Sequence, residues 1–383
     1  MSSAISGNRN ALFVFYDNGG IAPFTEVVKK LPEMGITPYT LAMATAAERA
    51  EGLGFDKKQI IYLKDAGVQT DVSATGWPRA RKLPDNEVAL VVKKVKELNP
   101  ELILTGTHSY VQFQLVEAIA NACDLQDKKL AYYDTLHTLF ERHPDGLMTL
   151  FSHNNYHLLV PNVPIARAIS ETKVTVVGSS GLENDVRKII AAQKDRAEIL
   201  RKIGFSEEHK KAVYIGGYAD GYEDSVCLFL DIVTWLRANG EPDLQVAIAI
   251  HPKFAKVPIE GAIEYQLVQK RKVPDIKFPV GIATTHELIA ISDFAPSCFS
   301  LLVPAALAAG VPSAFINAHP EKLAGNVLIE EGLCKNLQTP EEVKAALDEK
   351  LPEKNFFERI GMPGDGATNL ANAVKEAIDA MTV

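Results

Sequence analysis

The chain has 383 residues, of which 47% are hydrophobic and 23% charged, and its formal net charge is −8. The length favours two domains, and the composition is that of a globular protein, which excludes an intrinsically disordered chain. Lys and Arg are scattered, which argues against a nucleic-acid-binding surface, and no run approaches the roughly 20 apolar residues of a membrane span.

The N-terminal segment and the cysteines indicate the compartment. Residues 1–10 are polar and lack the basic and apolar regions of a secretory signal. Cys123, Cys227, Cys298 and Cys334 lie far apart, and no C-x-x-C pair is present. We expect buried, reduced thiols and a cytoplasmic protein.

Strand-like apolar runs alternate with helical patterns in the N-terminal half. Residues 11–16 form a continuous apolar run that ends at Asp17-Asn18-Gly19-Gly20, and a helical pattern follows at 23–33. This order is typical of a strand in a parallel sheet. Further strands are expected at 37–42, 59–64, 101–105, 130–133, 156–160 and 173–178, and further helices at 44–52, 85–98 and 111–123.

The C-terminal half repeats this opening. A long charged helical pattern at 179–205 marks the connection, and the apolar run 212–215 then leads into Gly216-Gly217-Tyr218. The expected elements that follow are strands at 244–250, 264–268, 293–295 and 313–317, and helices at 223–238, after Thr284, at 299–309, 340–350 and 367–381.

We therefore predict an α/β protein of two Rossmann-like domains that face each other across a cleft. The N-terminal domain is expected at 1–178 and the C-terminal domain at 179–366. The last helix, in residues 367–383, is expected to cross back to the N-terminal domain. The long loops at 65–84 and 136–155 are candidates for covering the cleft.

Four histidines, in and just after the second of these loops, suggest a metal site at first sight. Their spacing matches no dedicated zinc motif, so we expect solvated loop histidines and no bound metal. These residues are His137, His143, His153 and His157.

The two paired-glycine turns are the first candidate binding elements. Gly19-Gly20 and Gly216-Gly217 each follow a strand, and glycine lets backbone N–H groups approach an anion closely. Tyr218 continues the second turn. Neither turn is a complete phosphate-binding motif, and the alternative is that each glycine serves only the turn.

Four further residues are candidate phosphate ligands. His251 ends the strand at 244–250, Ser297 and Ser300 precede the helix at 299–309, and Thr285 precedes another helix. Ligands of α/β proteins bind at the carboxyl ends of strands, and hydroxyls beside free N–H groups favour an anion. The alternatives are a strand-ending surface histidine and simple N-capping.

Three titratable residues follow apolar strands in the N-terminal half: Asp17, His108 and Asp134. Each is a candidate general base, provided that it faces the cleft and reaches a proton within hydrogen-bonding distance. Each could instead form a turn or cap a helix.

The order of these features resembles the GT-B superfamily of nucleotide-sugar glycosyltransferases. Within it, the chain is similar to the undecaprenyl-pyrophosphate-linked N-acetylglucosaminyltransferases and to the UDP-N-acetylglucosamine 2-epimerases. The resemblance covers nearly the whole chain and lies in short signatures. They are the turn at 17–23, Gly106-Thr107-His108-Ser109, Val176-Val177-Gly178, Gly216-Gly217-Tyr218 and the segment 297–312, which ends in Ala-Ala-Gly-Val-Pro.

Two departures from the superfamily's pattern are visible. The glutamate that usually binds the ribose hydroxyls, five residues before the glycine of the last signature, is replaced by Ala305. The first loop lacks the histidine that serves as base in many inverting members. The His251-Pro252 pair and Asp134 also resemble features of GT-B sialyltransferases, which use CMP-sugars.

The resemblance implies a metal-independent glycosyltransferase without a cofactor, which moves a sugar from a nucleotide-sugar donor to an acceptor hydroxyl. The C-terminal domain would bind the nucleotide, and Gly216, Gly217, His251, Ser297 and Ser300 would stabilise the departing phosphate. Asp17, His108 or Asp134 would activate an acceptor on the N-terminal side. A homodimer is expected by default. The alternatives are a nucleotide-sugar epimerase or hydrolase, a CMP-sugar transferase and a catalytically silent binding protein.

Overall fold

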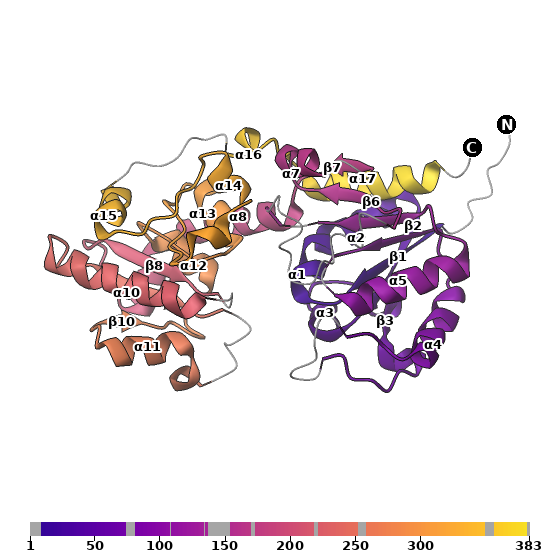
Figure 1. The fold of residues 1–383 in the computed structure, drawn as a ribbon, viewed down its shortest axis with the longest axis horizontal. Helices are drawn as coiled ribbons and strands as arrows, with labels where there is room; N and C mark the ends of the chain where they lie inside the picture. The colour runs from indigo at the N-terminus through magenta and orange to yellow at the C-terminus, as the bar shows by residue number, and fades with distance from the viewer. Residues whose placement is uncertain are drawn as a thin grey trace. The chain divides into compact units, whose positions relative to one another are not determined.

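A computed structural model of the chain divides it into two compact units (Figure 1). The first unit is Met1–Gly181 with Gly361–Val383, and the second is Leu182–Ile360. Each unit is described by itself. The structure describes residues 9–73, 81–107, 109–133, 135–136, 154–169, 173–217, 221–251, 258–348 and 356–380.

The first unit is built on a seven-stranded sheet in the order β3-β2-β1-β4-β5-β6-β7, in which every pair of neighbours is parallel. This is the strand order of a doubly wound Rossmann sheet, and it confirms the predicted fold class. The strands are β1 (Arg9–Phe15), β2 (Ile36–Ala42), β3 (Ile60–Tyr62), β4 (Leu102–Thr105), β5 (Lys129–Tyr132), β6 (His157–Val160) and β7 (Val174–Val176).

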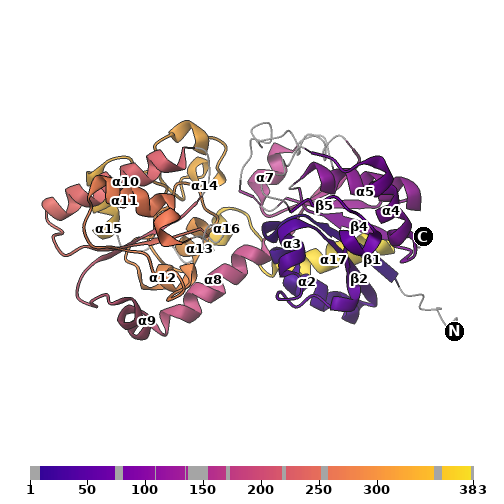
Figure 2. The same ribbon diagram turned by 90° about the horizontal axis from the view of Figure 1, so that it is seen from below.

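Helices cover both faces of this sheet because its central strands are apolar on both sides. On one face, Phe15 of β1 packs against Phe24, with ring centroids 4.9 Å apart. The same cluster contains residues of α2 (Thr25–Lys30) and of α17 (Gly366–Asp379), the yellow helix of Figures 1 and 2. The C-terminal helix therefore belongs to the core of the first unit.

The other face is covered by α4 (Asp85–Lys96) and α5 (Tyr110–Cys123), which pack against each other. Ser109 caps α5 by accepting a hydrogen bond from the backbone N–H of Gln112. The Gln112 side chain donates to the carbonyl of Val14 at 2.6 Å, which fastens the start of α5 to β1. The short helices of this unit are α1 (Asn18–Ile21), α3 (Ala44–Arg49) and α7 (Val163–Ala168).

The second unit has a parallel sheet in the order β10-β9-β8. Its strands are β8 (Lys211–Ile215), β9 (Gln245–Ala249) and β10 (Ile276–Lys277). Isolated parallel bridges extend it beyond β8, from Ile215 to Ser297, from there to Phe315, and on to Asn336. The order is again that of a Rossmann sheet, with its later strands reduced to single bridges.

Helices cover the second sheet in the same way. Val213 of β8 belongs to a core cluster with α9 (Arg196–Ile203) and α12 (Thr285–Ile291). The next residue, Tyr214, points to the opposite face and packs against Phe229 of α10 (Tyr222–Ala238), with ring centroids 4.7 Å apart. The helices not yet placed are α8 (Ser180–Gln193), α10 (Tyr222–Ala238), α11 (Ile263–Arg271), α13 (Leu302–Ala308), α14 (Val327–Glu330), α15 (Pro340–Asp348) and α16 (Phe356–Arg359).

One predicted strand is wrong. Residues 264–268 lie in helix α11, where Glu264, Leu267 and Val268 are buried with the i, i+3, i+4 spacing of a helix. Ile263, Tyr265 and Leu267 lie at every second position, a spacing that a strand would also show. The predicted long helix at 179–205 is two helices, α8 and α9, and β10 was not predicted.

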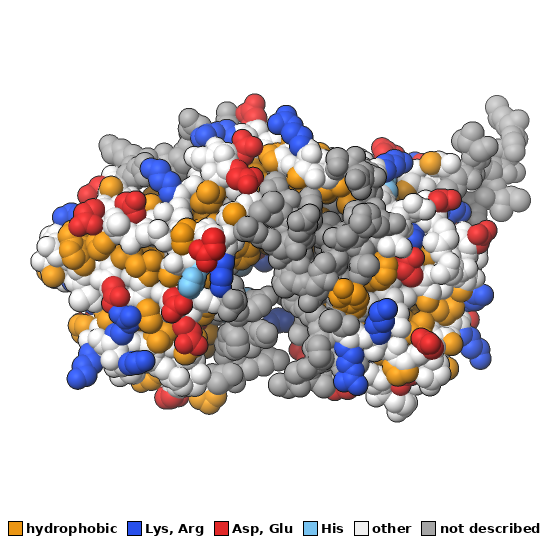
Figure 3. All heavy atoms as spheres, in the orientation of Figure 1, with side chains coloured by type: hydrophobic (Ala, Val, Ile, Leu, Met, Phe, Trp, Pro, Cys, Tyr) orange, Lys and Arg blue, Asp and Glu red, His pale blue; other side chains and the backbone are white. Residues whose placement is uncertain are grey.

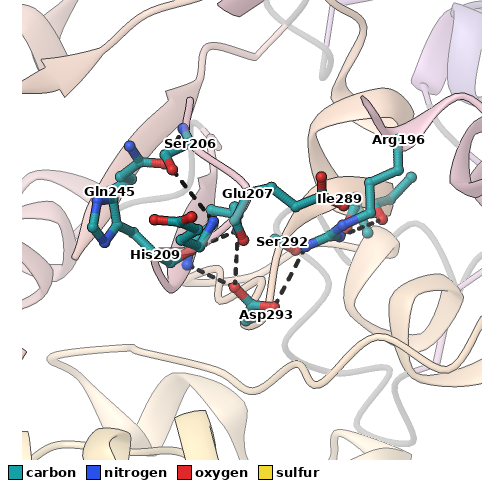
Figure 4. A network of polar contacts seen from close by, with 11 residues as sticks. Arg196, Ser206, Glu207, His209, Gln245, Ile289, Ser292 and Asp293 are labelled. Carbon is teal, nitrogen blue, oxygen red and sulfur yellow. Dashed lines mark hydrogen bonds and ion pairs between the residues drawn. The ribbon is translucent and has the colours of Figure 1, made fainter. Parts of the chain in front are cut away.

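A buried lysine stands at the first position of β8, at the amino edge of the second sheet. The Lys211 amine donates to the Glu207 carbonyl at 2.9 Å and to the His209 carbonyl, and it lies 4.0 Å from Asp293. Asp293 also faces Arg196 of α9 at 3.6 Å (Figure 4). These contacts tie the segment before β8 and helix α9 to this edge of the sheet.

The chain leaves and re-enters the first unit through two segments that pack together. Gly178 has a φ of +84°, and a Cβ atom there would lie 2.5 Å from the carbonyl oxygen of Pro363. Position 178 therefore requires glycine both for its backbone conformation and for space. The boundary between the units falls two residues into α8, after Gly181.

Charges of both signs are interspersed on the face drawn in Figure 3, and no stripe of Lys and Arg crosses it. Among the described residues, no helix combines the length and apolar character that crossing a membrane requires.

The stability of the first unit is expected to fall in mild acid because of His157 at the start of β6. Burial, and then the charge of Lys173, lower the pKa of this histidine from 6.5 to about 4. The unfolded chain takes up the proton near pH 6.5, whereas the folded chain does so only near pH 4. The unfolding free energy is therefore highest above pH 6.5 and falls as the pH drops towards 4. We expect a loss of roughly 1–2 kcal/mol over this range, because the ring is partly solvated.

The measurement is the unfolding free energy by denaturant titration at pH 7, 5.5 and 4. His157→Gln is the matched variant, since it can keep the polar contact with the Thr175 hydroxyl, 2.7 Å from Nε2, without titrating. Its profile should be flatter than that of the wild type. Parallel profiles would contradict the prediction.

Candidate functional site

The carboxyl edge of the second sheet gathers most of the predicted binding residues. Gly216 and Gly217 follow β8, His251 follows β9, and Ser300 follows the bridge residue Ser297. Because these strands are parallel, their carboxyl ends lie at one edge, which is where ligands of α/β sheets bind. Thr285 opens α12, after β10, and belongs to the same edge.

Gly216 is held closely against the end of β9. Its backbone N–H donates to the Ala249 carbonyl at 2.8 Å. A Cβ atom at position 216 would lie 2.3 Å from that oxygen and 2.9 Å from the backbone nitrogen of His251. Packing alone therefore requires a glycine at position 216. The hydrogen bond to Ala249 fixes the turn next to His251.

The predicted hydroxyl ligands differ in exposure. Ser297 is fully buried, and its hydroxyl donates to the Ile215 carbonyl at 2.8 Å, which joins the strand ends. Ser300 is half-buried, and its oxygen accepts from the N–H of Leu302 at the start of α13. Thr285 is half-buried as well, and α12 is capped by the preceding Thr284. Of these three described hydroxyls, Ser300 and Thr285 are the ones with surface that a ligand can reach.

The first paired-glycine turn is built differently. Asp17 accepts a hydrogen bond from the N–H of Gly20 at 2.8 Å, so its carboxylate closes the turn that starts α1. Gly20 is buried, whereas Gly19 is exposed, and among the described residues only Asp17 lies near the place of its missing side chain, at 3.6 Å. The described contacts give Asp17 a turn-closing role, and its predicted role as a base stays a prediction.

Three predicted site residues lie outside the described part of the chain. They are His108 and Asp134, the other two candidate bases, and Tyr218 of the second glycine turn. The same holds for His137, His143 and His153 of the histidine-rich loop. In the part that the structure describes, no group of three metal-ligating side chains occurs.

The sequence reasoning missed two polar residues at the carboxyl edge of the second unit. Glu264 is fully buried in the first turn of α11 and accepts a hydrogen bond from the Tyr222 hydroxyl at 2.6 Å. Glu264 was hidden by the wrong strand assignment; its helical spacing from Leu267 and Val268 could have placed it on a buried face.

His319 is the second of them. It follows the bridge residue Phe315, and its Nε2 lies 2.8 Å from an Asp224 carboxylate oxygen at the start of α10. A histidine soon after a predicted strand is the same signal that singled out His251.

Burial sets the protonation state of the cysteine thiol at this edge. Cys298, directly after Ser297, is 1% exposed, and burial raises the pKa of its thiol to about 11. It is therefore protonated at neutral pH and is not an activated nucleophile. Asn317 donates to its carbonyl at 3.0 Å, which ties this turn to the next strand end.

Solved structures share this architecture. The UDP-GlcNAc 2-epimerase from Methanocaldococcus jannaschii matches with a TM-score of 0.64 at 13% identity, over 96% of this chain and 99% of that chain. A putative UDP-N-acetylglucosamine 2-epimerase from Listeria monocytogenes matches with 0.63 at 14% identity, over 98% of both chains. MurG from Acinetobacter baumannii matches with 0.55 at 12% identity, over 96% and 99%.

These matches confirm the predicted resemblance to GT-B enzymes at the level of the fold, which is what such low identities show. No protein-family model and no curated protein sequence matches the chain.

The different packing of the two glycine turns predicts different responses to an added methyl group. Gly216→Ala places a Cβ atom against a backbone oxygen that cannot move without disturbing β9. We expect a loss of about 1–3 kcal/mol in unfolding free energy. Gly19→Ala is the matched control; it meets only an ordinary contact, and we expect no loss of stability. Denaturant titration measures both, and equal stabilities would contradict this packing argument.

Proposed function

We propose that the chain is an enzyme that acts on a nucleotide sugar, bound at the carboxyl edge of the second sheet, and that it transfers the sugar to an acceptor hydroxyl. The observation that carries the proposal is the grouping of the Gly216–Gly217 turn, His251 and Ser300 at this edge. The fold shared with UDP-GlcNAc 2-epimerases and MurG supports it.

Each of these groups suits a phosphate. The Gly216 N–H is already bonded to the Ala249 carbonyl, so the turn contributes space for a ligand to approach the backbone closely. An imidazole can donate to a phosphate oxygen, and a hydroxyl beside a helix start can do the same. Donors held in place before the reaction stabilise the charge that develops on the leaving phosphate without reorganisation. The hydrogen bond between Gly216 and Ala249 supplies this rigidity, because it fixes the turn relative to the end of β9.

The predicted acceptor-activating bases are in the first unit: Asp17, His108 and Asp134. A base must accept the proton of the acceptor hydroxyl as the bond to the sugar forms. For Asp17, the hydrogen bond from Gly20 would orient the carboxylate.

Epimerisation of the nucleotide sugar is the second candidate reaction. It is supported by the fold shared with the two UDP-GlcNAc 2-epimerase structures described above. Such an enzyme needs no acceptor.

Nucleotide sugars are expected to stabilise the protein against heat, and His251 is expected to carry part of their binding. A panel of UDP-, GDP-, CMP- and CDP-sugars is tested by thermal shift, because a ligand that binds only the native state raises the melting temperature. His251→Ala should weaken the best ligand roughly tenfold, the effect of losing one hydrogen bond to a charged group. His209→Ala, at the opposite edge of the same sheet, is the control and should bind like the wild type. If no member of the panel stabilises the wild type, the proposal is wrong.

The reaction is identified by its products. The protein is incubated with the stabilising nucleotide sugar, with and without a lysate-derived pool of acceptors, and the sugars are separated by chromatography. Release of the nucleotide only when acceptors are present supports transfer. If the nucleotide sugar alone yields an epimer, the reaction is epimerisation and not transfer; if it yields free sugar, the reaction is hydrolysis. Binding without turnover would indicate a binding protein.

A further inference from the structure

A carboxylate is buried directly behind the Gly216–Gly217 turn. Glu264, in the first turn of α11, has no exposed surface. Its Oε1 accepts a hydrogen bond from the Tyr222 hydroxyl at 2.6 Å and lies 3.3 Å from the place of a Cβ atom on Gly216. The acidic group and the turn are therefore in close contact, on the side away from solvent.

The charge of Glu264 is only partly compensated. Its second oxygen, Oε2, is buried without a hydrogen-bond partner, and within the described ranges no Lys, Arg or His forms an ion pair with it. A buried carboxylate normally has several donors or a cation. Here its described partner is a single tyrosine hydroxyl from α10.

The neighbouring groups on three elements respond to this charge. They are Tyr222 on α10, Tyr214 on β8 and Cys298 after the bridge residue Ser297. Burial raises the pKa of each, and the negative charge of Glu264 raises it further. The charge of the carboxylate therefore acts as far as Cys298, whose Sγ lies 3.3 Å from the place of a Cβ atom on Gly217.

We propose that Glu264 is a specificity-determining residue of the nucleotide-sugar site, whose negative charge limits the charge that a ligand can place at the Gly216–Gly217 turn. This inference rests on the proposed function. Charges a few ångströms apart and shielded from water interact more strongly than on the surface, so each added ligand charge costs affinity. A diphosphate is therefore penalised more than a monophosphate.

The test compares UDP with UMP, which share the nucleoside and differ in one phosphate group. Binding to the full-length protein is measured by calorimetry for the wild type and for Glu264→Gln, which keeps the volume and an acceptor for Tyr222 but removes the charge. We expect UDP to bind about tenfold more tightly to the variant and UMP about threefold, in line with the extra charge. Glu223→Gln, exposed in the first turn of α10, is the control and should change neither affinity by more than about twofold, because solvent screens it.

If Glu264→Gln does not fold, Glu264→Leu removes the same charge in an apolar form, and the same ordering of the two gains is expected. Equal gains for UDP and UMP, or weaker binding of both, would overturn the inference and leave Glu264 with a packing role alone. If neither nucleotide nor nucleotide sugar binds the wild type or the variant, the proposed function fails, and this inference fails with it.

Discussion

The candidate site depends on the hydrogen bond between the Gly216 N–H and the Ala249 carbonyl, together with the absence of a side chain at position 216. This contact brings the end of β8 against the end of β9. It fixes the distance between the glycine turn and His251, and it leaves Glu264 room below the turn. A side chain at 216 would separate these elements. The positions of the glycine turn, His251 and Glu264 thus depend on one backbone contact.

The two paired-glycine turns look alike in the sequence and differ in their physical basis. Gly216 is a glycine because a backbone oxygen occupies the space of its side chain, whereas in the part of the chain that the structure describes a Cβ atom on Gly19 would meet only Asp17, at an ordinary 3.6 Å. At the first turn the organising group is a side chain, Asp17, which accepts from Gly20. The rigid turn is therefore the one in the second unit, and it is the better of the two for binding a charged group without reorganisation.

The order of strands and the edge at which they end could be predicted, because buried parallel strands are long apolar runs and their ends are marked by glycine and polar residues. Residues 11–16 and 212–215 are examples. The neighbours of each strand end could not be predicted. Glu264 lies in a segment that was predicted as a strand and folds as a helix, and its buried carboxylate contacts Tyr222 of α10, 42 residues away in sequence. Likewise, the burial of Ser297 depends on pairing with β8, which no local pattern reveals.

The position of the acidic group distinguishes this site from the pattern that the sequence resembles. Ala305, which stands where a ribose-binding glutamate is usual, is fully buried within α13, so a carboxylate there would be desolvated without a partner. The buried carboxylate of this unit instead comes from α11 and faces the glycine turn. A carboxylate that accepts hydrogen bonds from hydroxyls attracts a ribose, whereas one placed behind a turn that binds a phosphate repels that phosphate. Under the proposed function, a carboxylate on α11 in place of one on α13 would therefore discriminate the phosphates of a nucleotide and not its ribose.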